Sequence, residues 1–445
     1  MVMRIVRQRY VGVPIAVFLL TWALLLPGTA TPVQAQGTLA EVSFYSSALD
    51  QERSFSIYLP AGYDPEGATR YPVVYFLHGL GASPQTYSGA LSLGLDVLIG
   101  MRTISPVIVV LPDGGAAPYA GSFYTSSALY GDIEGYLTED LVRYVDAHYA
   151  TIDSRQGRAL IGHSMGGFGA MRLALRHPEL FRAAVSHSGP LDLAQAPTVM
   201  PALLAEYGTP PYEYTPTAGF FSLAVFSMAG AFTPAAPGAA SLVELPVDSQ
   251  GRLVPEVLAR WNEHSPVRFA RELAARGVAL ELLFDCGTED ELGLYPWNVA
   301  FADSLTEIGL PFAFESYAGG HSDKIMQRLL LSMQWLDGRF ATPIEPVTAV
   351  TTAAAVQPAA FRLEPNHPNP FNAETAIPFT LQRAQAVRLE VYSVLGHRVA
   401  VLVDEELPAG RHTVPWRAAG LGTGVYFVRL EADAQVETRP LLLLR

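Results

Sequence analysis

The chain has 445 residues, of which 29 are basic and 42 acidic, so its formal net charge at pH 7 is −13. An acidic, lysine-poor surface argues against nucleic-acid binding, which needs basic patches, and it favours solubility. The single cysteine, Cys286, excludes an intrachain disulfide, so apolar cores must hold the protein together. A chain of this length is expected to form two or three domains.

The first 35 residues have the pattern of a secretory signal peptide. Three arginines precede an almost wholly apolar run, Val11–Leu26, which is short for a membrane span. Small residues around Ala35 suit cleavage by signal peptidase. We therefore expect residues 1–35 to be a signal peptide, and a membrane anchor is the alternative interpretation.

Residues 36–341 alternate between strand and helix patterns. An antiparallel hairpin is expected first, at Glu41–Ser47 and Ser54–Leu59. Further strands are predicted at Val73–Leu77, Val107–Leu111, Ala159–Ile161, Ala183–Ser186, Ala279–Phe284 and Phe312–Ser316. Amphipathic helices are predicted at Tyr136–Tyr149, Phe168–Arg176, Val267–Arg276, Trp297–Ile308 and Lys324–Leu336. This alternation predicts an α/β domain whose mostly parallel sheet is flanked by helices.

Residues 191–264 interrupt this alternation with an apolar, aromatic and proline-rich segment. The segment follows the predicted strand Ala183–Ser186, at the carboxyl edge of the sheet, where ligands bind in open α/β folds. It is either a packed surface excursion or a cap that shapes a ligand pocket.

The last part of the chain has a different character. Residues 342–360 are rich in Pro, Ala, Thr and Val without a helical or strand period, which predicts an extended linker. Residues 361–445 show short alternating strands between Gly and Pro turns, at Val387–Val391, Arg398–Val403, Arg411–Pro415, Val425–Leu430 and Glu437–Leu442. These strands predict a small all-β sandwich domain.

The pentapeptide Gly162-His163-Ser164-Met165-Gly166 lies between a strand pattern and a helix pattern. A G-x-S-x-G elbow in this context places a serine hydroxyl at the tip of a sharp turn, where a substrate carbonyl can reach it. Small residues are needed because the turn is strained and neighbouring chains approach closely. Ser164 is therefore the candidate nucleophile.

A serine nucleophile needs a base within hydrogen-bond reach and an acid that orients the base. His321 is the best base candidate among ten histidines, because it follows two glycines in the loop after the last strand of the predicted sheet. His187 and His264 remain open as alternatives.

The acid is expected in the turn that follows the strand Ala279–Phe284. Asp285, Glu289 and Asp290 are all within reach of that turn. Position along the chain does not separate Asp285 from Asp290, so both remain candidates on this argument.

An anionic tetrahedral intermediate needs preorganised N–H donors. One is expected from Met165, directly after the candidate nucleophile, and the other from Leu80 in the glycine-containing loop His78–Gly81. A plain glycine turn is the alternative for that loop. The sequence has no His/Cys cluster at metal-ligand spacing, so we expect no metal and no organic cofactor.

Together these motifs resemble the esterase D-like family of α/β-hydrolases, which includes feruloyl and acetylxylan esterases, S-formylglutathione hydrolases and mycolyltransferases. The resemblance covers roughly residues 39–339 and rests on Leu77–Gly81, Leu111–Gly114, Ser122–Tyr124, Gly162–Gly167, Cys286–Asp290 and Gly319–His321. It implies an α/β-hydrolase fold with Ser164 as nucleophile and His321 as base. Members with a C-G-T-x-D turn use its last Asp, which implies Asp290 as the acid. Oxyanion N–H groups at Leu80 and Met165 are implied as well.

The C-terminal region resembles the sorting domains of the type IX secretion system. The resemblance rests on Asn366–Asn372, Val391–Gly396 and Gly422–Phe427, and covers roughly residues 361–445. It implies contact with the secretion machinery and passage through the outer membrane of a Gram-negative bacterium, to the medium or the cell surface. An accessory β-sandwich, such as a carbohydrate-binding module, is the alternative.

These expectations combine into a secreted serine esterase that forms an acyl-enzyme on a small-molecule or polysaccharide-linked ester. Transfer of the acyl group to another alcohol would use the same residues up to the acyl-enzyme. The alternative that is not an enzyme is a non-catalytic surface binding protein on the same scaffold.

Overall fold

The computed structural model describes residues 36–207, 212–215, 217, 219–342, 361–364, 366–369, 371–393, 398–422, 424–432 and 435–443. The predicted signal peptide, residues 343–360 of the predicted linker and parts of the sorting motifs lie outside the described residues. Within these ranges, no helix combines the length and the apolar character needed to cross a membrane.

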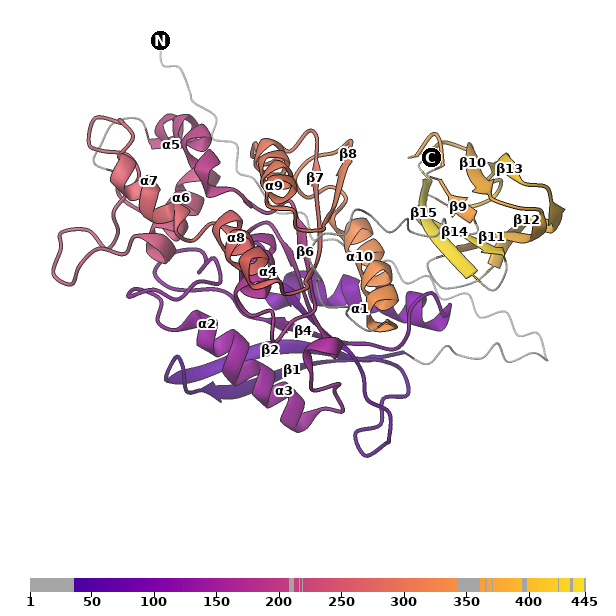
Figure 1. Cartoon of the computed structure of the whole chain (residues 1–445), viewed down its shortest axis with the longest axis horizontal. Coiled ribbons are helices and arrows are strands. Elements are labelled where there is room, and N and C mark those ends of the chain that lie inside the picture. Colours follow the sequence, from indigo (N-terminus) through magenta and orange to yellow (C-terminus); the bar gives the residue numbers. More distant parts are fainter. Residues whose placement is uncertain are drawn as a thin grey trace, which may run out of the picture. The chain divides into compact units, whose positions relative to one another are not determined.

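An eight-stranded sheet forms the centre of the N-terminal domain (Figure 1). Its strands are β1 (Thr38–Ser46), β2 (Gln51–Leu59), β3 (Val73–Leu77), β4 (Ile108–Pro112), β5 (Arg158–His163), β6 (Ala183–His187), β7 (Glu281–Gly287) and β8 (Ala313–Tyr317). Their order is β1-β2-β4-β3-β5-β6-β7-β8. Strand β2 is antiparallel to both neighbours, and the other pairs are parallel. This is the α/β-hydrolase fold, which confirms the predicted fold class.

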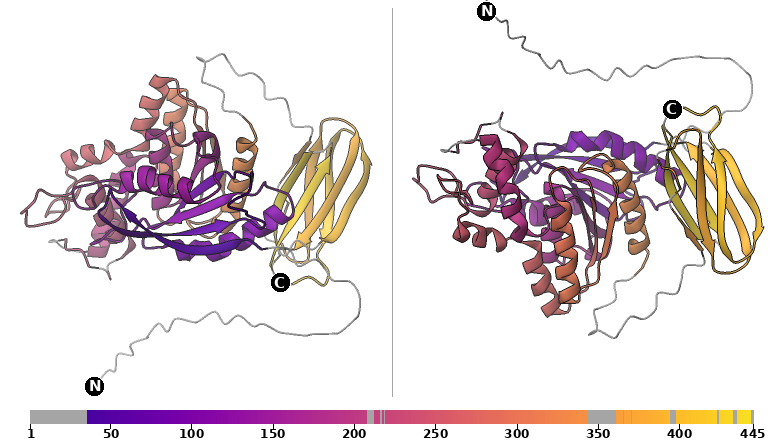
Figure 2. Two further views of the ribbon diagram at one scale, coloured as in Figure 1. Left: turned by 90° about the horizontal axis from the view of Figure 1, so that it is seen from below. Right: turned by 90° about the horizontal axis from the view of Figure 1, so that it is seen from above.

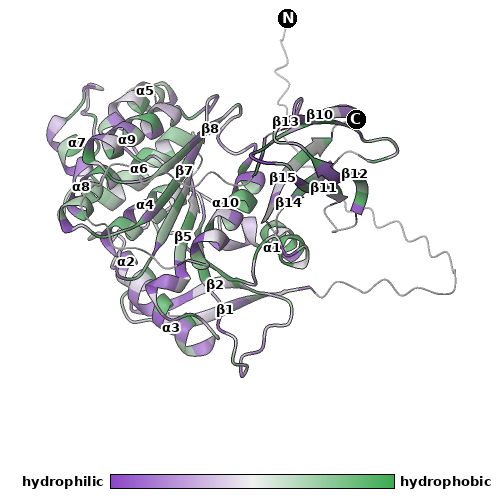
Figure 3. Cartoon of the chain, turned by 45° about the vertical axis from the view of Figure 1, so that its right-hand side comes forward, coloured by the Kyte–Doolittle hydropathy of each residue, from purple (hydrophilic) through white to green (hydrophobic). Residues whose placement is uncertain are grey.

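Both faces of the central strands are buried, which explains their continuous apolar runs. Side chains of β3 alternate between two apolar clusters: Val73, Tyr75 and Leu77 belong to one, and Val74 and Phe76 to the other. Figure 3 shows the hydrophobic colour along these strands. The sheet is therefore a layer between two cores, each covered by helices on its own side (Figure 2).

The helices of this domain have the following bounds: α1 (Pro84–Gly100), α2 (Ile133–Gly135), the π-helical η1 (Tyr136–Leu141), α3 (Val142–His148), η2 (Arg155–Gly157), α4 (Met165–Arg176), η3 (Leu193–Val199), α5 (Met200–Tyr207), α6 (Phe220–Phe232), α7 (Pro255–Asn262), α8 (Pro266–Arg276), α9 (Tyr295–Ile308) and α10 (Ile325–Phe340).

The sequence analysis missed helix α1. Two glycines in its interior, Gly89 and Gly94, lower its helix propensity. A methyl group at Gly94 would lie 2.6 Å from Leu330 Cδ2 on α10, so the glycine lets the two helices pack closely. Tertiary packing has thus overridden the weak local signal.

Residues 191–264 are largely helical where they are described, although the sequence showed no helical period there. They contain η3, α5, α6 and α7, and α5, α6 and α7 lie together at one end of the domain (Figure 1). The buried side chains of this segment join the apolar cluster on one face of the sheet. Trp261 on α7 is fully buried, and its Nε1–H donates to Thr233 Oγ1 over 3.0 Å. Helix α6 is apolar nearly all round, which removes the amphipathic signal there.

The C-terminal domain is a sandwich of two antiparallel sheets, as predicted. One sheet has the order β13-β10-β9 and the other β12-β11-β14-β15. The strands are β9 (Phe361–Leu363), β10 (Glu374–Leu381), β11 (Gln385–Ser393), β12 (Arg398–Leu407), β13 (Gly410–Arg417), β14 (Gly424–Ala432) and β15 (Gln435–Leu443). Strands β9 and β10 were not predicted. Side chains from both sheets form one apolar cluster between them.

Candidate active site

The turn between β5 and α4 has the geometry of a nucleophile elbow. Ser164 adopts φ 55° and ψ −118°, a conformation that non-glycine residues rarely take. Its N–H donates to the His187 carbonyl over 2.8 Å, which holds the turn against β6. A methyl group at Gly162 would lie 2.0 Å from the Gly166 carbonyl oxygen, and one at Gly166 only 1.9 Å from that of Leu77. The small residues of the pentapeptide are therefore a steric requirement.

His321 and Asp290 form a hydrogen-bonded pair at the carboxyl edge of the sheet. His321 Nδ1 lies 2.8 Å from Asp290 Oδ2, and both side chains are largely buried. We assign the proton to Nδ1, because a carboxylate accepts but does not donate. Burial alone would raise the pKa of Asp290, but the hydrogen bond and the charge of His321, together with the Leu292 N–H and the Cys286 thiol, outweigh it and hold that pKa below its usual value. His321 Nε2 is then left free to accept a proton.

Asp285 belongs to a different network. It is completely buried inside β7, where its Oδ2 lies 2.8 Å from His187 Nδ1 and accepts a hydrogen bond from Arg328 Nε over 2.8 Å. Ser332 Oγ lies 3.2 Å from the other nitrogen of His187, Nε2. The structure therefore places Asp285 with His187, and places Asp290 with His321. The Glu289 side chain is exposed.

His163 connects the elbow to the loop that carries His321, a role that the sequence did not reveal. Its Nε2 lies 3.1 Å from the His321 carbonyl oxygen, and its Nδ1 lies 2.9 Å from the Tyr87 hydroxyl. Burial and then the charge of His321 lower the pKa of His163 to about 3, so its ring is neutral. Nothing in the sequence indicates these partners, because Tyr87 and His321 are distant from His163 in the chain.

Ser164 and His321 are brought near one another by this connection. The rings of His163 and His321 have their centroids 5.0 Å apart, and Ser164 follows His163 directly. Among the described residues, no hydrogen bond joins the Ser164 hydroxyl to His321. In free enzymes the contact between nucleophile and base often tightens only when substrate binds.

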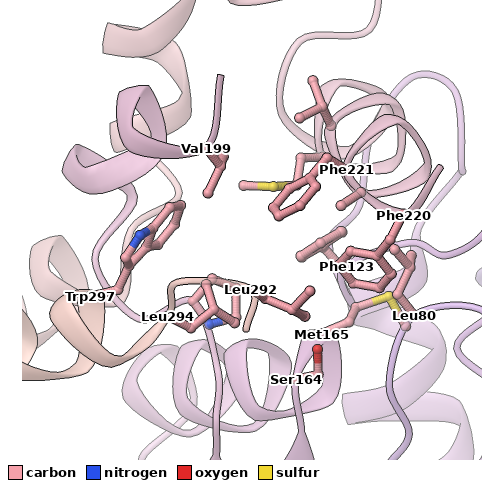
Figure 4. A pocket seen from close by; sticks show the side chains of 14 residues that line it. Leu80, Phe123, Ser164, Met165, Val199, Phe220, Phe221, Leu292, Leu294 and Trp297 are labelled. Carbon is pink, nitrogen blue, oxygen red and sulfur yellow. The ribbon is translucent and has the colours of Figure 1, made fainter. Parts of the chain in front are cut away.

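The two predicted oxyanion donors lie at the same place as Ser164. Met165 is the first residue of α4, so its N–H has no partner within the helix and lies at the positive end of the helix dipole. Leu80 is held in a loop that His78 anchors, since His78 Nε2 accepts from the Gly114 N–H over 2.9 Å. Leu80, Ser164 and Met165 line one cavity (Figure 4). The predicted nucleophile and the residues of both predicted oxyanion donors therefore meet at one cavity.

The cavity beside Ser164 is lined almost entirely by apolar side chains. Helix α6 of the 191–264 segment provides one wall, with Phe220, Phe221, Ala224, Val225 and Met228. Facing side chains in Figure 4 include Val199, Leu292, Leu294 and Trp297.

Cys286 is buried next to Asp290. Its Sγ lies 3.4 Å from Asp290 Oδ2, and burial, reinforced by the Asp290 charge, raises the pKa of the thiol well above its usual value. A thiol that stays protonated is a poor nucleophile.

Replacing Cys286 by alanine is expected to lower kcat by less than about tenfold, because only one weak S–H hydrogen bond to the carboxylate is lost. Steady-state ester hydrolysis measures the change. A complete loss of activity in a variant with wild-type circular dichroism would instead indicate thiol chemistry.

The chain is similar to several known proteins over part of its length. A Mycobacterium tuberculosis protein named as an esterase is 35% identical over 150 residues, which are 34% of this chain and 32% of that protein. An endo-1,4-beta-xylanase/feruloyl esterase of Xylanibacter ruminicola is 32% identical over 151 residues, 33% of this chain and 20% of that protein. The chain thus spans a third or less of the length of these curated relatives. A solved ferulic acid esterase covers 69% of this chain and 99% of its own, with 20% identity and a TM-score of 0.49.

Family models match two parts of the chain. Residues 367–443 match the family described as "Secretion system C-terminal sorting domain", which indicates a secreted or cell-surface protein. Residues 46–334, more than half of the chain, match the family described as "Putative esterase". The protein therefore belongs to this esterase family and carries a secretion sorting domain at its C-terminal end.

Proposed function

We propose that the protein is a serine carboxylic-ester hydrolase with Ser164 as nucleophile, His321 as base and Asp290 as the acid that orients it. The observation that carries the proposal is the strained Ser164 elbow, which opens into the same cavity as Leu80 and Met165 and adjoins the His321–Asp290 pair. The membership of the esterase family supports it.

The reaction follows from the positions of these groups. Ser164 Oγ attacks the ester carbonyl carbon while its proton passes to His321 Nε2, and the N–H groups of Leu80 and Met165 stabilise the oxyanion. The C–O bond to the alcohol then breaks as His321 returns the proton to the leaving oxygen. Water attacks the resulting acyl-enzyme with His321 again as base, which releases the acid and restores Ser164. Asp290 keeps the imidazole in one tautomer and stabilises the imidazolium.

The alcohol part of the substrate is proposed to be a carbohydrate or another small hydroxyl compound. The relative that is named as a xylanase and feruloyl esterase supports a carbohydrate ester. Transfer of the acyl group to a second alcohol would give a different product from the same acyl-enzyme, so chromatography of products with and without added alcohols distinguishes hydrolysis from transfer.

Labelling with a fluorophosphonate tests the proposal directly. We expect one label per molecule, located on Ser164 by peptide mass spectrometry, because an activated serine attacks the phosphorus. The Ser164→Ala variant is the matched control and should stay unlabelled. A folded wild-type protein that takes no label and hydrolyses no ester would favour a non-catalytic binding protein.

The division of the chain is also proposed. Residues 1–35 act as signal peptide, 36–341 as esterase domain with 191–264 as its cap, 342–360 as linker and 361–445 as sorting domain. The sorting domain is proposed to engage the type IX machinery, which carries the protein across the outer membrane of a Gram-negative bacterium. The separate apolar core of the C-terminal sandwich supports this division.

A chain that ends at Thr342 is expected to fold and to hydrolyse esters within about twofold of the full-length rate, since all proposed catalytic groups precede that residue. In the native host, deletion of residues 361–445 should leave active enzyme in the periplasm. Activity assays of medium and periplasm measure the result. Normal export of the shortened chain would contradict the sorting role, and weakened binding to insoluble polysaccharide would indicate a carbohydrate-binding module.

A further inference from the structure

His163 is a buried titratable residue that the proposed mechanism does not use. It is the last residue of β5 and directly precedes Ser164. Its Nε2 lies 3.1 Å from the His321 carbonyl oxygen and 3.5 Å from Ser322 Oγ, and its Nδ1 lies 2.9 Å from the Tyr87 hydroxyl. The ring therefore contacts the loop of the proposed base with one nitrogen and helix α1 with the other.

The direction of both hydrogen bonds follows from the carbonyl group at one end. A carbonyl oxygen only accepts, so His163 Nε2 carries the proton and donates to His321. Burial, and then the charge of His321, lowers the pKa of His163 to about 3, so the ring is neutral and its Nδ1 accepts from Tyr87. Burial raises the pKa of Tyr87, which keeps its hydroxyl protonated as the donor. The hydrogen bonds thus form one chain from Tyr87 through His163 to the backbone of His321.

The same two side chains pack against the loop that carries Leu80, one of the proposed oxyanion donors. This oxyanion loop, His78–Gly81, precedes α1, and Tyr87 lies near the start of that helix. A methyl group at Gly79 would lie 3.4 Å from His163 Nδ1 and 3.5 Å from the Tyr87 hydroxyl oxygen. The backbone of the oxyanion loop is therefore in close contact with both members of the chain.

The other hydrogen bonds of His321 do not reach the elbow. Its imidazole pairs with Asp290, and its N–H donates to Glu291 Oε2 over 2.8 Å. Asp290 orients the ring, but the distance from the ring to Ser164 depends on where the backbone of His321 lies. Within the described part of the chain, the hydrogen bond from His163 is the one that joins this backbone to the elbow.

We propose that His163 and Tyr87 are positioning residues, which hold His321 in place relative to Ser164 and to the oxyanion loop. The proposal rests on the proposed esterase function and adds residues to its site. Transfer of the serine proton needs nucleophile and base within hydrogen-bond reach, and a displacement of about 1 Å can cost about 100-fold in rate. Without His163 the His321 carbonyl would lose its partner, and the loop would have to move to find another.

His163→Leu removes both polar atoms and keeps an apolar side chain in the site. With a p-nitrophenyl ester we expect kcat to fall by about 30- to 100-fold while KM stays within about threefold. KM should hold because His163 and Tyr87 are not among the described residues that line the cavity beside Ser164. The rate of fluorophosphonate labelling should fall with kcat, since labelling needs the same base. Unchanged kcat and labelling rate in folded protein would overturn the proposal.

His163→Gln is the conservative variant, and it also covers the case in which the Leu variant does not fold. Its amide keeps an N–H donor for the His321 carbonyl and an oxygen acceptor for the Tyr87 hydroxyl. We expect kcat to return to within about fivefold of the wild-type value. A Gln variant that is folded and as slow as the Leu variant would show that packing of the ring, and not the hydrogen-bond chain, determines the rate.

Two buried tyrosines provide a matched pair of variants. Tyr87→Phe removes the donor to His163 Nδ1, whereas Tyr58→Phe removes a hydroxyl on β2 that donates to Asp96 Oδ1 over 2.8 Å. We expect Tyr87→Phe to lower kcat about three- to tenfold and Tyr58→Phe to leave it unchanged. Tyr87→Phe added to His163→Leu should cause no further loss, because both act through one chain. Equal kcat in the two Phe variants, or additive losses in the double variant, would contradict the proposal.

Failure of this proposal can be told apart from failure of the proposed function. Labelling of Ser164 and ester hydrolysis by the wild-type protein keep the esterase assignment, and the variants of His163 and Tyr87 then decide the positioning role alone. Absence of both labelling and hydrolysis in folded wild-type protein removes the esterase assignment, and the positioning role with it.

Discussion

Replacement of Ser164 by alanine is expected to lower kcat for ester hydrolysis by on the order of 10⁴–10⁶, because the reaction loses its only nucleophile. His321→Ala should have an effect of similar size, since an unassisted serine hydroxyl attacks slowly. The double variant should be barely worse than either single variant, because the three residues act as a unit. Steady-state kinetics with a p-nitrophenyl ester measure all three variants.

Both replacements have matched controls on the same domain. Ser92→Ala on α1 changes a half-buried serine and His148→Ala on α3 an exposed histidine, both outside the proposed site, and they should leave kcat within about twofold. Thermal unfolding should show that all variants are folded. Near-normal hydrolysis by Ser164→Ala would remove the proposed nucleophile and, with it, the proposed mechanism.

Asp290→Asn is expected to lower kcat by on the order of 10⁴, with little change in stability. The amide has no charge to stabilise the imidazolium, and its NH₂ group can hold His321 in the wrong tautomer. Asp290 is the partner of His321 Nδ1 at 2.8 Å, so the effect should appear in kcat with every ester. Kinetics across the pH range separate this effect from a shift in the pH optimum.

Asp285→Asn provides the contrasting variant. It removes the charge that pairs with buried Arg328 and weakens the hydrogen bond to His187, so the free energy of unfolding should fall by about 3–5 kcal/mol. The kcat of the folded fraction should stay within about tenfold. If instead Asp285→Asn abolished catalysis and Asp290→Asn did not, the acid role would pass to Asp285.

Much of the fold was predictable from local patterns. Strands that are buried on both faces need continuous apolar runs, and helices that cover them need one apolar face. Short segments of the sequence therefore predict where β3 to β8 occur along the chain. The elbow around Ser164 was predictable for a similar reason, because the steric demands of the turn act on neighbouring residues. Helix α1 was not, because Gly94 in its interior is explained only by contact with Leu330 on α10.

The candidate site was only partly determined by the sequence. The serine, the histidine and a choice of acids followed from motifs and from chain order, and a family resemblance was needed to prefer Asp290 to Asp285. The pairing itself is decided by tertiary structure. The two carboxylates are five residues apart in the chain, yet Asp290 pairs with His321 and Asp285 with His187. The contacts of His163 and the apolar cavity under α6 were decided in the same way. Local patterns determine which segments become strands, helices and turns, whereas hydrogen-bond partners and cavity walls come from residues that are distant in the chain and meet only after folding.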